Sequence, residues 1–165
     1  MWKELIEVLR DIMQQYYEIL LLAQQKKNII VSANVKELNS IVAKEQRAMQ
    51  VITKLEEKRQ KIQQDLANKG LITAANANIQ EIIELCDEEP KQELTKLRKA
   101  IKQIAEELGA KNKENNALLS KALSFVQFNI NLLSQAEVVP TYGVEQNQNK
   151  PVQSVVKRAL FDQKI

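Results

Sequence analysis

The chain of 165 residues carries a net charge of +3, with 44% hydrophobic, 27% charged and only 4% aromatic residues, and it contains no histidine and one cysteine. This length allows one domain with appendages, and the missing histidine removes catalytic triads, most transition-metal sites and the usual acid and base at neutral pH. A single cysteine permits no internal disulfide, and three isolated glycines provide no phosphate-binding loop, so we expect neither an enzyme nor a cofactor.

The first half of the chain is predicted to form a hairpin of two long helices. Residues 2–31 place apolar side chains at steps of three and four, as one face of a helix requires. The link 32–34 interrupts this pattern, and Asn34 with Glu37 fits a capping pair that starts a second helix. That helix is expected to end near Lys69, because Gly70 can take the left-handed conformation that closes helices. The short link predicts antiparallel packing.

Charged residues interrupt the apolar side of the second predicted helix. Glu45, Glu56 and Arg59 lie on the same face as its apolar residues. The expected apolar positions are Leu38, Ile41, Val42, Met49, Ile52, Leu55, Ile62 and Leu66.

The region 71–89 is predicted to contain a short helix, started either by Thr73 or by the Asn78 and Glu81 pair. Pro90 suits the first turn of the next helix. Apolar residues with an alternating spacing of three and four then predict a seam like that of a coiled coil. The first positions of this seam are Leu94, Leu97, Ile101, Ile104 and Leu108.

The middle of the last predicted helix is polar. Asn112, Asn115 and Asn116 follow Gly109 closely. They either fix the register of the bundle by hydrogen bonding across it, as a buried asparagine does in coiled coils, or form an exposed turn of helix. The pattern does not decide whether the helix continues through Gly109.

The composition changes after Ala136, and we assign residues 1–137 to a helical bundle and 138–165 to a mobile tail. Within the tail, a short amphipathic segment has basic residues between its apolar ones, and it is too short to be stable without a partner in this chain or another. Its apolar positions are Val152, Val155, Val156 and Leu160.

The distribution of charge and apolar residues restricts the partners. Most of the net positive charge lies in the tail, so the nearly neutral body offers no basic face for nucleic acid. The sequence contains no run of about eighteen apolar residues, which a membrane-spanning helix would need. The first residues do not resemble a secretory signal, and we therefore expect a cytoplasmic protein.

Three stretches together resemble the FlgN family of flagellar export chaperones. They are the second-helix run from Leu38 to Arg59, the asparagine-bearing run from Asn112 to Leu119, and the Tyr-Gly motif at 141–143. Members of this family often carry another glycine shortly after the motif, whereas Val144 follows here. The resemblance implies an all-α bundle of three to four helices that binds the C-terminal helical segments of hook-filament junction proteins of the FlgK and FlgL types.

The resemblance also implies two binding sites. Tyr142 is expected to dock to the cytoplasmic domain of the FlhA-type export-gate protein, although a simple turn is the alternative. The predicted substrate-binding residues are either exposed contacts or part of the chain's own core, and the tail segment could cover them. These residues are Leu118, Leu119, Ala122, Leu123, Val126 and Ile130.

Two other functions fit the same sequence. A structural coiled-coil protein would only associate with itself, for example as a homodimer. A tether acting through the basic tail would bind membranes or nucleic acid with a steep dependence on salt.

Overall fold

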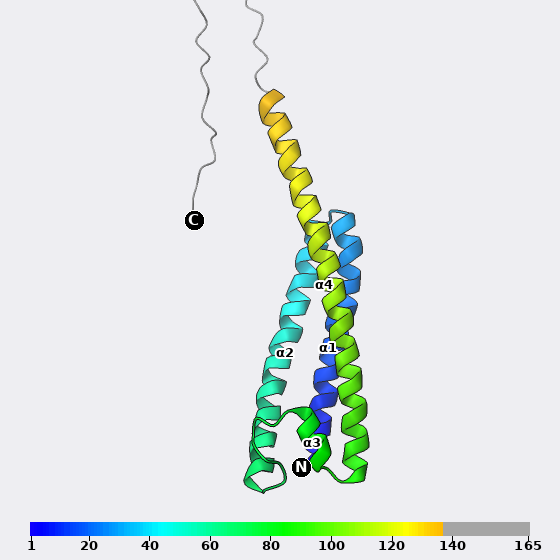
Figure 1. Cartoon of the computed structure of the whole chain (residues 1–165). Coiled ribbons are helices and arrows are strands. Elements are labelled where there is room, and N and C mark those ends of the chain that lie inside the picture. Colours follow the sequence, from blue (N-terminus) through cyan, green and yellow to red (C-terminus); the bar gives the residue numbers. More distant parts are fainter. Residues whose placement is uncertain (137–165) are drawn as a thin grey trace, which may run out of the picture.

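The computed structural model describes residues 1–136, which form four helices and no strand (Figure 1). They are α1 (Trp2–Val31), α2 (Val35–Asn68), α3 (Ile79–Leu85) and α4 (Glu88–Ala136). The predicted all-α bundle is confirmed, while the proposed tail 138–165 lies outside the described residues. Within the described part, no helix combines the length and the hydropathy that crossing a lipid bilayer requires.

Helix α1 is the central element of the bundle, because both α2 and α4 pack against it (Figure 1). Helix α2 returns antiparallel to α1, as the short link predicts. The segment with α3 then crosses the base, so α4 starts beside the N-terminal half of α1 and runs parallel to it. An ion pair of 3.0 Å between Arg10 and Glu93 joins these two helices near the base.

Short-range capping sets the helix boundaries. The Asn34 side chain accepts the backbone N–H of Glu37 at 3.1 Å, and Gly70 adopts a φ of 68° just after α2. Asn78 forms a full capping box with Glu81, so Asn78 rather than Thr73 starts α3. The amides at a helix start have no partner within the helix, which is why these side chains fix where each helix begins.

The main hydrophobic core lies at the base of the bundle, where all four helices contribute to it. A smaller cluster of Ile19, Ala48 and Ile52 continues the contact between α1 and α2 further up. Burial is therefore concentrated at the end of the molecule that holds α3. The fully buried large residues of the base are Leu5, Val8, Ile12, Leu66, Ile82 and Leu94.

The predicted apolar side of α2 is partly wrong. Val42 and Met49 are exposed, at 37% and 49%, while Ala48 is buried in their place. Because α1 is the one helix of the described part that lies closely alongside α2, only a narrow strip of α2 is covered. Glu45, which interrupts the predicted strip, forms an ion pair of 2.6 Å with Lys26 that is only slightly exposed.

Candidate functional site: the projecting end of the last helix

Helix α4 continues through Gly109 without a break. A Cβ atom at this position would meet nothing within 4 Å, so neither close packing nor an unusual backbone angle requires glycine there. A glycine inside a helix costs about 1 kcal/mol, which a long helix tolerates. At about 1.5 Å per residue, α4 is roughly 74 Å long and α1 roughly 45 Å. The end of α4 therefore projects beyond the other helices (Figure 1).

Asn115 joins α4 to α1 near the point where α4 leaves the bundle. It is 2% exposed, and its Nδ2 donates a hydrogen bond of 2.8 Å to the carbonyl oxygen of Ala23. Asn112 and Asn116 are exposed. Of the two expectations for the polar middle of this helix, hydrogen bonding across the bundle holds for Asn115 and the exposed turn for the other two.

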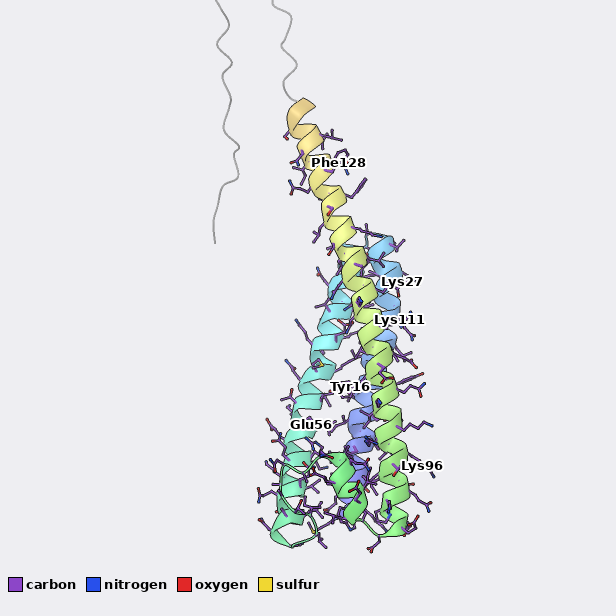
Figure 2. The ribbon with its side chains drawn as sticks, viewed as in Figure 1. Tyr16, Lys27, Glu56, Lys96, Lys111 and Phe128 are labelled. Atoms are coloured by element: carbon purple, nitrogen blue, oxygen red, sulfur yellow. The ribbon has the colours of Figure 1, made fainter. Side chains whose placement is uncertain are left out.

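Three charged side chains, which we term the charged collar, surround the same junction. Glu114 lies 2.6 Å from the ammonium group of Lys27 on α1 and 3.4 Å from that of Lys111 on α4. The hydrogen bond from Lys27 is the main cause that lowers the pKa of Glu114 below its ordinary value. Figure 2 shows Lys27 and Lys111 close to the upper end of α1. The collar and Asn115 together hold the base of the projecting part.

Beyond the collar, residues 119–136 of α4 form what we term the projection. Figure 2 shows Phe128 on this part, past the ends of α1 and α2. Lys121 is the one charged residue of the projection. A large exposed apolar surface marks a site of interaction. The exposed large apolar residues are Leu123, Phe125, Val126, Phe128, Ile130, Leu132 and Leu133.

These residues form two separate stripes along the projection. The aliphatic stripe comprises Leu119, Leu123, Val126, Ile130 and Leu133, at alternating steps of four and three. The aromatic stripe comprises Phe125, Phe128 and Leu132, and Lys121 precedes it on the same line. With about 100° between successive residues, the two stripes lie about 150° apart around the helix. The aliphatic stripe continues the side of α4 that carries Asn115 and faces α1.

The structure separates the six residues that were predicted to bind substrate. Leu118 and Leu119 are half-buried at the junction, whereas Ala122 and the three beyond it are exposed. The alternative that these residues belong to the chain's own core therefore fails for the four exposed ones, which are Ala122, Leu123, Val126 and Ile130. Their role in substrate binding stays a prediction.

Some predicted binding residues lie outside the described part of the chain, and some exposed apolar residues of the projection were not predicted. Tyr142 lies outside the described residues, and so does the amphipathic segment of Val152, Val155, Val156 and Leu160. The aromatic stripe and Leu133 were not predicted as contacts. Their spacing of three and four along the helix was the signal that could have identified them.

The remaining described surface offers less for chemistry. A groove of about 430 Å³ between α1 and α2 is lined by apolar residues that include Leu22 and Val51 and by the basic residues Lys44 and Arg47. Within residues 1–136, no three acidic or cysteine side chains come together as metal ligands would. The projection carries seven of the sixteen large apolar side chains that are exposed within residues 1–136, and it is the candidate site.

Comparison with known proteins identifies relatives along nearly the whole chain. The sequence profile of a protein family described as FlgN protein matches residues 1–150. The chain is also 28% identical over 162 residues to "Uncharacterized protein YvyG" from Bacillus subtilis (strain 168), and this match covers 98% of each chain. No solved structure matches the chain.

Proposed function

The chain belongs to the FlgN family of flagellar export chaperones, and on this premise we propose that it binds hook-filament junction proteins of the FlgK and FlgL types in the cytoplasm. It would bind their C-terminal helical segments, prevent premature assembly and deliver them to the export gate. The family is one of chaperones, not of enzymes. The observation that carries the proposal is the aliphatic stripe, whose apolar side chains are largely exposed on the part of α4 that extends beyond α1 and α2.

The position of the aliphatic stripe suits an incoming helix. Asn115 and Leu119 lie one turn apart on the side of α4 that faces α1. A substrate helix laid on the stripe would therefore follow on from the end of α1 and extend the bundle. Helices bind in this way when an apolar face meets a complementary groove or line of side chains.

The charge of the projection predicts the character of this binding. Lys121 is its one charged residue and lies on the line of the aromatic stripe. Burial of apolar area therefore provides most of the binding free energy, at about 25 cal/mol per Å². Salt screens interactions between exposed charges strongly and apolar contacts little, so the affinity for a substrate helix should depend only weakly on ionic strength.

Co-purification with hook-filament junction proteins tests the proposed function. Tagged full-length chain should retain FlgK-type and FlgL-type subunits, and subunits that lack their C-terminal helix should not be retained. Failure to retain any junction subunit would contradict the proposal.

Self-association is the second candidate function, because two copies could also cover each other's projections. Measurement of molar mass by light scattering separates the two. The chaperone proposal predicts a complex whose mass changes when a junction protein is added. A coiled-coil protein that only self-associates would keep the mass of its oligomer, and its stripes would be unavailable to the added subunit.

A further inference from the structure

The aromatic stripe remains uncovered when a substrate helix occupies the aliphatic stripe. The two stripes lie about 150° apart, whereas a helix packed against one neighbour buries a face of roughly 100°. One visiting helix therefore cannot cover both. Phe125 and Phe128 are 67% and 59% exposed, and aromatic side chains of this size contribute much of the binding free energy where they are buried.

The aromatic stripe is a feature of the projection alone. Along the same line of α4, the bundled part carries Glu107 and Glu114, which precede Lys121 and Phe128 at intervals of seven residues. After Lys121, at the start of the projection, the line becomes apolar with Phe125, Phe128 and Leu132. Its occupant therefore lies along the projection and does not continue down the bundle.

We propose that the chain's own segment 152–162 packs on the aromatic stripe as a short helix. The segment is joined to the end of α4 by residues 137–151. A linker of this length reaches up to roughly 50 Å when extended and about 22 Å on average as a flexible coil. The projection is roughly 27 Å long, so the segment can reach every position on the stripe. Tethering also gives an effective concentration on the order of millimolar.

The lengths and charges of the two partners match in an antiparallel arrangement. As a helix, the segment from Val152 to Asp162 spans about 15 Å, and the stripe from Leu132 back to Lys121 spans about 17 Å. When Val152 lies beside Leu132, the carboxylate of Asp162 therefore comes beside the ammonium group of Lys121. An exposed ion pair of this kind adds at most about 1 kcal/mol, so it selects the register while the apolar contacts hold the segment.

The pattern of the segment agrees with this arrangement. Val155 would lie opposite Phe128, and Ala159 opposite Phe125. Each pair is separated by about one helical turn, four residues in the segment and three in the stripe. The basic side chains between them would point to solvent. The tail segment then occupies the aromatic stripe and the substrate helix the aliphatic stripe. The place of the substrate rests on the proposed function, whereas the place of the tail segment does not.

Amide hydrogen exchange of the full-length chain, without any substrate, tests the proposal. Residues 152–162 should exchange about tenfold more slowly in the wild type than in a chain carrying Phe125→Ser and Phe128→Ser, because docking protects the helix amides. The matched control is Leu123→Ser. Leu123 is 69% exposed, nearly the same as Phe125, but lies on the aliphatic stripe, and its replacement should leave the protection unchanged.

A charge exchange checks the register. Lys121→Glu should reduce the protection, and adding Asp162→Lys should restore it. Equal exchange in the wild type and the Phe125 and Phe128 variant would overturn the proposal, and so would protection that depends on protein concentration, since the segment would then pack on a second copy. The replaced side chains are exposed, so the bundle should stay folded, and unchanged exchange of the α1 amides in the same experiment confirms that the comparison is valid.

Discussion

The side-chain amide of Asn115 in α4 donates a hydrogen bond of 2.8 Å to the main-chain carbonyl of Ala23 in α1, and it links two helices that run in the same direction. Asn115 is buried, but its Oδ1 has no hydrogen-bond partner among the described residues. A buried polar group of this kind specifies a single register, because a shifted helix would leave it without its partner. The bond therefore sets how far α4 extends beyond α1.

Asn115→Ala should lower the free energy of unfolding by about 1–2 kcal/mol, through loss of the hydrogen bond and of packing. Asn116→Ala is the matched control, because Asn116 is the adjacent residue and is exposed. Its replacement should change stability by less than about 0.5 kcal/mol. Urea denaturation measures both values, and similar losses in the two variants would show that Asn115 does not hold the junction.

Stability should fall with acidity partly through Glu114. The hydrogen bond from Lys27 lowers the pKa of Glu114 in the folded chain, so the folded state binds fewer protons than the unfolded state. Its contribution is complete above the ordinary carboxyl pKa of 4.5 and is lost as the pH falls through the lowered value. Thermal unfolding of Glu114→Gln between pH 3 and 7 should show a weaker pH dependence than the wild type. Parallel curves would contradict this account of the collar.

Cys86 should react slowly with alkylating reagents. Its thiol donates a hydrogen bond of 3.1 Å to the carbonyl of Ile82, and burial, followed by the nearby charge of Asp87, raises its pKa above 9.0. Because the thiolate is the reactive form, iodoacetamide at pH 8 should modify the folded chain about tenfold more slowly than the urea-unfolded chain. Equal rates would mean that the base of the bundle opens readily.

Tyr142→Ala should weaken binding to the cytoplasmic domain of the FlhA-type export-gate protein, because an aromatic anchor contributes much contact area for little lost freedom. A loss of about tenfold or more in affinity is expected, with binding to junction proteins unchanged. Tyr17→Ala on α1 is a suitable control, since it removes an exposed tyrosine of the bundle. Loss of both gate and substrate binding in Tyr142→Ala would refute the division of roles between the tail and the projection.

The helix boundaries could be predicted because they depend on neighbouring residues. Asn34, Gly70 and Asn78 act through backbone groups within a few positions of themselves, and each lies at a helix end as expected. Two alternatives at the start of α3 remained open because Thr73 and Asn78 are both good capping residues. In the structure Asn78 starts the helix, because it forms the full capping box with Glu81.

The shape of the candidate site could not be predicted in the same way. Gly109 can either end a helix or lie inside one, and the projection exists only because α4 passes through it. The exposure of Met49 and the second stripe of the projection also depend on which helices are neighbours. The periodicity of a sequence indicates which side chains share a face, but it does not show whether another helix covers that face.

The aliphatic stripe is the surface on which binding of a junction protein most directly depends. Calorimetric titration of a FlgK-type C-terminal helical peptide into the full-length chain measures this. Leu123→Asp should weaken binding about tenfold to a hundredfold, since an apolar contact worth roughly 1.5–3 kcal/mol is lost. Leu71→Asp, at another exposed leucine far from the projection, should leave the affinity unchanged. Equal affinities for the wild type and Leu123→Asp would contradict the account.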